Sequence, residues 1–195
     1  MERDALLSGT VQPGGRAPAP GRLALVQMLV NSVDREHGPD LFDEVAGLTD
    51  WLAARGLLDP GATVGEADLR PARELREALR SMMHANNGAP EDPSARGALD
   101  AAAAAAELHP TFPVEGPELV PAKGGVDGAL GRVVAATFAA MLDGSWARMK
   151  ACPRNVCGWA FYDRSSNASA TWCSMAVCGA RVKAGAYYRR RRGAG

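Results

Sequence analysis

The sequence CPRNVCGWAFYDRSSNASATWCSMAVC, residues 152–178, holds all four cysteines of the 195-residue chain. They form two Cys-x4-Cys pairs that are separated by fifteen residues. Two local pairs of thiolates joined by a longer segment suit a tetrahedral zinc ion, because each pair closes a small loop on the metal. Four sulfur ligands leave no open position for a water molecule, so the site would be structural. We therefore predict that Zn²⁺ is bound by Cys152, Cys157, Cys173 and Cys178.

Two other uses of four cysteines remain open. An iron–sulfur cluster takes the same set of sulfur ligands. Disulfides need an oxidising compartment, but the start of the chain, MERDALLSGTVQPGGRAPAPGR, has acids and prolines where a signal peptide has a cationic head and an apolar stretch. No uninterrupted apolar run approaches the ~20 residues that a membrane span requires. We therefore expect a cytoplasmic protein with reduced thiols and no membrane partner.

The residues between and after the cysteine pairs predict a treble-clef-like module, which is a hairpin followed by a helix. Residues 159–162 alternate aromatic and small side chains and predict one strand, residues 163–167 predict a turn, and residues 169–172 predict the returning strand. Ser174 is a candidate N-cap for the helix that follows. We expect the aromatic side chains to fill a small core, although such rings can also stack on bases; they are Trp159, Phe161 and Trp172.

The formal charge of the chain is zero, but the two signs are separated along the sequence. Residues 145–195 hold ten basic residues and one acid, a net charge of +9, so residues 1–144 carry −9. Such a basic excess on a small unit is typical of nucleic-acid binding. Alternatively, part of it compensates the negative charge of a zinc tetrathiolate or only solvates the surface. The candidates for contacts with double-stranded DNA are Arg164, Arg181, Lys183, Arg189, Arg190, Arg191 and Arg192.

The rest of the chain predicts a mainly α fold ahead of the zinc module. Residues 1–20 are rich in Gly, Pro and Ala and predict a flexible tail. Residues 21–144 predict a helical domain, with apolar side chains at helical spacing over residues 23–33, 45–55, 66–86, 94–108 and 126–142. Two stretches inside this domain, residues 109–114 and 118–122, predict a small β-hairpin. Residues 145–195 form the third unit, the zinc module.

The last of these helices has few polar side chains, which predicts that it is the central helix of the domain. The side chains that we expect to face inward are Leu130, Val133, Val134, Thr137, Phe138 and Met141.

Residues that could support catalysis are scattered. The three histidines, His37, His84 and His109, have no nucleophile or acid at a useful spacing. The sequence contains no phosphate-binding glycine loop, no Gly-x-Ser-x-Gly and no His-Glu-x-x-His. We therefore do not expect an enzyme.

Several residues of the C-terminal unit match a family pattern. The stretch from Cys152 to Arg192 resembles the CGNR zinc-finger family through Trp159, Phe161, Asp163, Asn167, the block Trp172-Cys173-Ser174-Met175 and the block Cys178-Gly179-Ala180-Arg181, with Lys183 and Tyr187 or Tyr188 beyond. The helical part resembles the ABATE domain of the same family, through a leading helix that ends near Asn31 and the sequence LRPARELREALRSMM followed by a glycine. The resemblance covers about Leu23 to Arg192.

The resemblance implies a bacterial transcription regulator whose zinc finger binds DNA and whose N-terminal domain senses a small molecule or forms a homodimer. Two departures bear on DNA contact: Ala180 replaces the signature asparagine of the family, and Ala170 and Thr171 stand where relatives often carry arginines. The arginines at residues 189–192 could offset that loss through phosphate contacts. The alternatives are a zinc-stabilised module that binds RNA or a protein without operator specificity, and an enzyme in the N-terminal domain, which would need a pocket with convergent polar groups.

Overall fold

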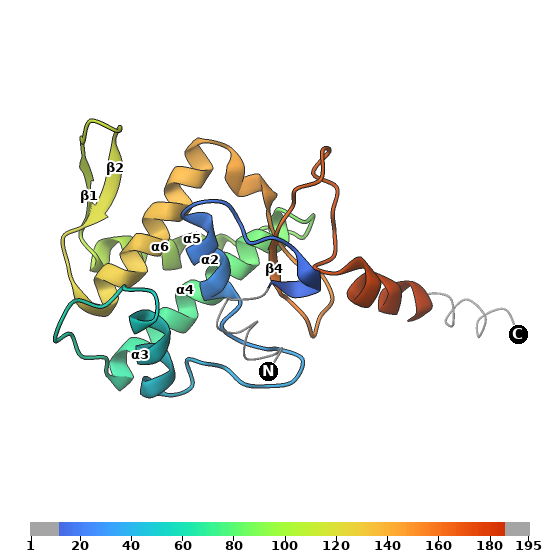
Figure 1. Cartoon of the computed structure of the whole chain (residues 1–195), viewed down its shortest axis with the longest axis horizontal. Coiled ribbons are helices and arrows are strands. Elements are labelled where there is room, and N and C mark those ends of the chain that lie inside the picture. Colours follow the sequence, from blue (N-terminus) through green and yellow to red (C-terminus); the bar gives the residue numbers. More distant parts are fainter. Residues whose placement is uncertain (1–11, 186–195) are drawn as a thin grey trace, which may run out of the picture.

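A computed structural model describes residues 12–185, and most of them form a helical domain with a small hairpin at one end and the zinc module at the other (Figure 1). The elements of the helical domain are α2 (Leu23–Val30), α3 (Val45–Ala53), α4 (Glu66–Ala85), α5 (Pro93–Ala105), β1 (Leu108–Thr111), β2 (Glu118–Pro121) and α6 (Gly125–Leu142). The mainly helical fold predicted from the sequence is therefore confirmed. Each helix begins within one residue of its predicted start and ends up to three residues earlier than predicted.

The central position of α6 is also confirmed, but not at its C-terminal end. The helix packs against α2, α5 and β2, and four of the six residues expected inside are buried, namely Leu130, Val133, Val134 and Thr137. Phe138 and Met141 are instead 45% and 40% exposed. Among the described residues α6 is the one helix that is long and apolar enough to cross a membrane, and 61% of it is buried inside the fold. Its apolar composition is thus explained by the core of the domain.

The small residues of α5 and α6 allow the two helices and the hairpin to approach closely. A Cβ atom on Gly131 of α6 would lie 2.4 Å from the Cβ of Ala106, at the end of α5. The hairpin is antiparallel and begins directly after α5, with Leu108 opposite Pro121 and Thr111 opposite Glu118. The predicted hairpin is therefore confirmed, but its first strand begins one residue and ends three residues earlier than expected, and its second strand ends one residue earlier.

Residues 12–20 differ from the flexible tail predicted for residues 1–20, of which the first eleven lie outside the described residues. This segment crosses the zinc module, and the side chain of Arg16 donates hydrogen bonds to the carbonyl oxygens of Cys173 (2.8 Å) and Trp172 (3.0 Å). The guanidinium group of Arg16 also lies 4.8 Å from the centre of the Phe161 ring. Ala19 is buried in the main core. The composition of the segment is typical of a tail, but these specific contacts hold it in place.

The zinc module consists of η2 (Ser145–Arg148), β3 (Met149–Ala151), β4 (Ala160–Tyr162) and η3 (Met175–Gly179), after which the chain continues as α-helix to the last described residue, 185. The first predicted strand exists as β4, but the second does not. β4 pairs with β3, which precedes the first cysteine, and residues 169–172 form no strand. The carbonyl oxygens of Ala168 and Ala170 instead accept hydrogen bonds from the buried ammonium group of Lys150. The side chain of Lys150 thus provides hydrogen bonds that a neighbouring strand would otherwise donate to these carbonyl oxygens.

The zinc module docks on the helical domain through buried hydrogen bonds to its backbone. Asn31, at the end of α2, accepts from the amide of Ala160 (2.7 Å) and donates to its carbonyl oxygen (3.0 Å). Arg80 of α4 is almost fully buried and donates to the carbonyl oxygens of Gly158 (2.5 Å) and Val30 (2.6 Å). Buried backbone groups must find partners, so these side chains make the two units depend on each other.

We predict that Arg80→Met, a replacement that keeps much of the volume, lowers the free energy of unfolding by about 3 kcal/mol, because it leaves buried carbonyl oxygens without donors. The measurement is urea unfolding of the full chain in excess zinc, followed by circular dichroism. Arg70→Met on the same helix is the control, since Arg70 is 79% exposed and should change stability by less than about 0.5 kcal/mol. Equal effects of the two substitutions would show that Arg80 does not hold the units together.

Candidate metal centre and nucleic-acid interface

The four cysteines lie together in the interior of the C-terminal module. Their sulfur atoms are all within 4.8 Å of one another, all four residues are buried, and none forms a disulfide. The Sγ atoms of Cys157, Cys173 and Cys178 are 3.5, 3.6 and 3.7 Å apart. A zinc ion with Zn–S bonds of about 2.3 Å needs sulfur atoms about 3.8 Å apart. The cluster therefore has the size of a tetrahedral zinc site.

The electrostatics of the cluster also call for a cation. Hydrogen bonds from the neighbouring thiols of Cys157 and Cys173 lower the pKa of Cys152 to about 2. The same contact with Cys152 raises the pKa of Cys157 to about 12, and contacts with Cys152 and Cys157 raise the pKa of Cys173 further. The cluster thus favours the ionised form of Cys152 and disfavours ionisation of Cys157 and Cys173. Four thiolates can exist together only if a metal ion neutralises them.

One cation of the protein is placed to stabilise the thiolates. The buried Nε atom of Arg154 has no oxygen or nitrogen acceptor among residues 12–185. Its side chain is hydrogen-bonded to Glu36 and, more weakly, to Cys178, and both contacts raise the pKa of Arg154. Metal-bound sulfur is a good acceptor for such a donor, because second-shell groups commonly bond to metal ligands. The donor set and its surroundings therefore fit zinc.

Local sequence explains how the second cysteine pair is positioned. The hydroxyl of Ser174 accepts from the amide of Val177 (3.3 Å), so the predicted N-cap is confirmed. Cys178 follows within the first turn, which is a π-type turn over residues 175–179. A Cβ atom on Gly179 would lie 2.4 Å from the sulfur of Met175 and 3.1 Å from Trp172. A larger residue at this position would crowd Trp172, the residue before Cys173, and would require the side chain of Met175 to move.

The aromatic residues form the small core around the sulfur atoms, as predicted. Phe161 is fully buried, Trp159 is 8% exposed, and Trp172 is partly buried against the same cluster. Their rings are therefore largely unavailable for stacking on bases. Tyr187 and Tyr188 lie outside the described residues.

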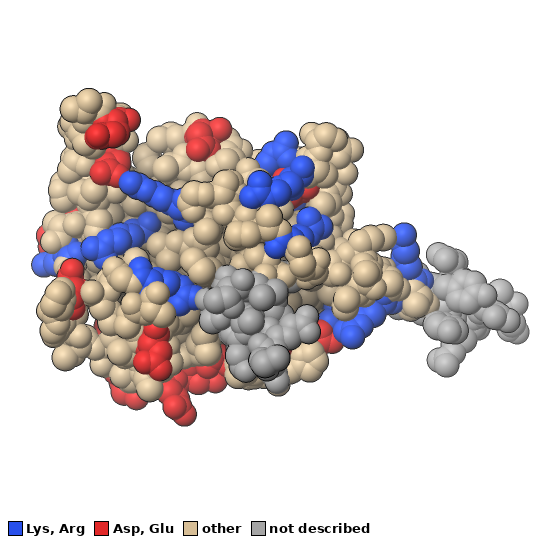
Figure 2. All heavy atoms as spheres, viewed as in Figure 1, with Lys and Arg blue, Asp and Glu red and all other residues tan. Residues whose placement is uncertain are grey.

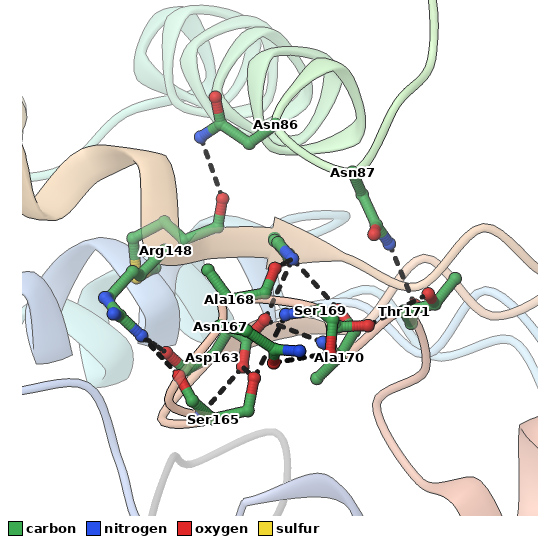
Figure 3. A network of polar contacts seen from close by, with 12 residues as sticks. Asn86, Asn87, Arg148, Asp163, Ser165, Asn167, Ala168, Ser169, Ala170 and Thr171 are labelled. Carbon is green, nitrogen blue, oxygen red and sulfur yellow. Dashed lines mark hydrogen bonds and ion pairs between the residues drawn. The ribbon is translucent and has the colours of Figure 1, made fainter.

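The loop between β4 and Cys173 is organised around the one acid of the module, Asp163 (Figure 3). Its fully buried carboxylate accepts from Lys150 (2.9 Å), from the amide of Ala170 (2.8 Å) and from both the amide and the hydroxyl of Ser165. Although burial raises the pKa of Asp163, these donors outweigh it and lower the pKa to about 2. Arg148 closes the loop by donating to the carbonyl oxygens of Asp163 and Ser165.

Two asparagines at the end of α4 bind the backbone of η2, of β3 and of the loop before Cys173 (Figure 3). Asn86 donates to the carbonyl oxygens of Trp146 and Met149, both at 2.9 Å. Asn87 donates to those of Ala151 (2.9 Å) and Thr171 (2.8 Å). β3 and the residues on either side of it are therefore held by α4 from outside the module.

The structure divides the basic residues of the module into two groups. Lys150, Arg148 and Arg154 are used in internal contacts, with Asp163, with loop carbonyl oxygens and with Glu36, respectively. Of the candidate DNA contacts, Arg164, Arg181 and Lys183 are exposed, and the other four, Arg189 to Arg192, lie outside the described residues. Arg164 donates to the carbonyl oxygen of Pro18. Figure 2 shows cations around the loop and helix of the module and acids gathered near α3.

Glu36 is a site residue that the sequence analysis missed. It lies in the loop after α2 and forms ion pairs with Arg154 and with Arg181, the latter at 2.9 Å. These two cations, Arg154 first, lower the pKa of Glu36. Nothing in the sequence indicates that this loop reaches the zinc module, because the contact spans 145 residues of the chain. The same loop contains His37, whose Nδ1 atom lies 3.2 Å from the carboxylate of Asp34.

A cavity of about 650 Å³ lies in the helical domain beside the exposed end of α6. It is bounded by α4, α5, α6, the hairpin and η2, and its walls include Phe138 and Met141, the two side chains that the sequence pattern placed inside. Asn86 and Trp146 also line it. One wall of this cavity is therefore formed by Asn86, the side chain that is hydrogen-bonded to β3.

The chain thus combines a helical domain with a buried four-cysteine site of the kind that holds a metal ion. Comparison with family models agrees: residues 21–145 match ABATE, described as "Putative stress-induced transcription regulator", and residues 148–191 match the CGNR zinc finger. Because the first match covers more than half of the chain, the protein belongs to the ABATE family. No curated protein matches it.

We predict that the purified chain binds one zinc ion and that Cys157→Ser lowers zinc affinity by at least tenfold, because a hydroxyl is a poor ligand for zinc beside three thiolates. The measurement is elemental analysis together with chelator competition. Asn155→Ala, in the same loop but exposed, is the control and should retain the metal. A protein that carries iron with sulfur-to-iron absorption, or no metal at all, would contradict the assignment.

Proposed function

We propose that this protein is a cytoplasmic transcription regulator, not an enzyme, whose zinc module binds double-stranded DNA. The observation that carries the proposal is the helix after Cys178. The cysteine cluster anchors its first turn, and its exposed side includes Arg181 and Lys183. Arg148 and Lys150 are held by internal partners. Lys183 is exposed, and Arg181 is exposed and paired with the side chain of Glu36, a pairing that a phosphate can replace.

In this proposal the metal and its cysteines have a structural role. Bound zinc closes the site, and Cys152, Cys157, Cys173 and Cys178 then hold the helix against Trp172 and the strand pair. Arg181 and Lys183 neutralise phosphates, and the arginines at 189–192 extend that contact. Ala180 is exposed, so the missing asparagine of the family removes no buried contact and bears only on what the helix surface can recognise.

The helical domain would supply regulation, by sensing a small molecule or by forming a homodimer. The cavity supports the first of these, because its wall contains Asn86, which also binds the carbonyl oxygens of Trp146 in η2 and of Met149 in β3. A ligand against Asn86 or Trp146 would act on the strand that leads directly to Cys152.

A second candidate function is binding of RNA or a protein partner. It is favoured by apolar side chains exposed close to the cations, since Met175 is 51%, Val177 46% and Val156 47% exposed. The DNA-binding experiment described next distinguishes RNA binding from DNA binding, because it includes a single strand and an RNA.

We predict that the zinc-loaded chain binds duplex DNA with a steep dependence on salt, and that the double variant Arg181→Ala, Lys183→Ala reduces the slope of log affinity against log salt by about 2, because two phosphate contacts are lost. The measurement is fluorescence anisotropy with a random-sequence duplex, a single strand and an RNA at several salt concentrations. Arg70→Ala with Lys123→Ala, two exposed cations of the helical domain, is the control with equal charge change. Preference for RNA, or an equal effect of the control, would contradict DNA binding through this helix.

We predict that Glu36→Gln strengthens DNA binding by about threefold to tenfold at low salt, because it releases Arg181 from an ion pair that competes with phosphate. The gain should shrink as salt rises, and anisotropy with the same duplex measures it. Glu115→Gln changes the charge equally in the hairpin loop, at the opposite end of the molecule from the zinc module (Figure 1), and should leave affinity nearly unchanged. Weaker binding by Glu36→Gln would show that the ion pair instead positions the arginine.

A further inference from the structure

We infer that the cavity between α4, α5 and α6 binds a small organic cation with an apolar body. This inference deepens the ligand-sensing role of the helical domain and rests on that part of the proposed function. It starts from the volume of about 650 Å³, which lies within the range of pockets that enclose small molecules.

The walls of the cavity are mainly apolar. Met82 comes from α4, Leu99 and Ala103 from α5, and Val134 and Phe138 from α6, while Leu108 and Leu119 close one side from the hairpin and Trp146 from η2. Phe138 and Met141 are 45% and 40% exposed, although most of α6 is buried in the core. Exposure of large apolar side chains to water is unfavourable, and their burial lowers the free energy. A ligand with an apolar body would cover them.

The charged residues of the cavity are mostly acidic. Three acids, Glu91, Asp92 and Asp100, and one cation, Arg96, line it. Glu91 is paired with Arg96 (2.9 Å), and Asp92 caps α5 by accepting from Ser94. The carboxylate of Asp100, by contrast, is exposed and forms no hydrogen bond or ion pair with residues 12–185. One carboxylate is therefore available to a ligand, and its charge selects a cation.

The aromatic rings reinforce this choice. Phe138 and Trp146 line the same cavity as Asp100. A quaternary or primary ammonium group is attracted both to a carboxylate and to the face of an aromatic ring. An anionic ligand would meet a net negative lining, and the one guanidinium group of the cavity already has a partner in Glu91.

A second copy of this chain is the main competing occupant. The hairpin loop carries the exposed apolar side chains Phe112 and Val114, which could enter the cavity of a partner. That loop also contains Glu115, which would approach the acidic lining of the partner's cavity. Like charges oppose such an exchange, so charge complementarity favours the small cation.

The test uses three probes of the same shape that differ in charge, 4-phenylbutylammonium, 4-phenylbutan-1-ol and 4-phenylbutanoate. Each is titrated at neutral pH by calorimetry into the zinc-loaded full chain. We expect the cation to bind about tenfold more tightly than the alcohol, a preference of the size of one partly exposed ion pair, and the carboxylate to bind most weakly. Absence of binding by the cation, or equal binding of all three probes, would overturn the inference.

Two matched pairs of variants locate the site. Asp100→Asn should reduce the preference for the cation over the alcohol to less than about twofold, whereas Asp127→Asn, an exposed acid of α6 that does not line the cavity, should retain it. Ala103→Trp fills the cavity and should abolish binding of all probes, whereas Ala104→Trp places the same ring on the exposed side of α5.

Two further outcomes are decisive. If Ala103→Trp converts a dimer into a monomer in light scattering, the cavity is an interface between copies and the inference fails. Probe binding does not depend on DNA. A chain that binds the cation but no duplex therefore contradicts only the DNA-binding part of the proposed function, and a chain that binds the duplex but no probe contradicts only this inference.

Discussion

The clustering of four buried sulfur atoms is the constraint on which the C-terminal module depends. The module contains only a few large side chains, chiefly Phe161, Trp159 and Trp172, and so small a core cannot offset the entropy of ordering the chain. Metal binding supplies the missing free energy, because the ligands come together only in the folded state. The segment of residues 12–20 and the loop around Asp163 both bind backbone that the cysteine cluster has already placed.

The separation of charge along the sequence has two physical origins that the structure distinguishes. Part of the basic excess stabilises the module itself, since Lys150 neutralises a buried carboxylate and Arg154 lies between Glu36 and Cys178. Of the other described cations, Arg181 and Lys183 project from the helix after the cysteines, and Arg164 is exposed in the loop before Cys173. An exposed cation costs nothing to the fold, but a group of them on one side of a small module attracts polyanions. Glu36 joins the two groups, because it pairs with one cation of each.

Local patterns in the sequence predicted the elements better than their pairing. Helices and the Ser174 cap follow from spacing and from residues near the ends, so they could be read directly. The partner of β4 could not, because the hydrogen-bonding choice of residues 169–172 is decided by Lys150, a side chain nineteen or more positions away. The apolar pattern of α6 likewise placed Phe138 inside, since periodicity identifies a face but not whether another element covers it. Glu36 and Arg80 act through contacts across the whole chain, for which spacing contains no signal.

Communication between the two units requires an element that both touch, and the segment from η2 to β3 has this property. Its carbonyl oxygens at Trp146 and Met149 bind Asn86, which lines the cavity, and Cys152 follows β3 directly. Asn87 then ties Ala151 to Thr171, which stands two residues before Cys173. A displacement at the end of α4 would therefore reach both cysteine pairs at once. Because a packed interior shifts between discrete arrangements, a ligand in the cavity would alter the anchored helix as a unit.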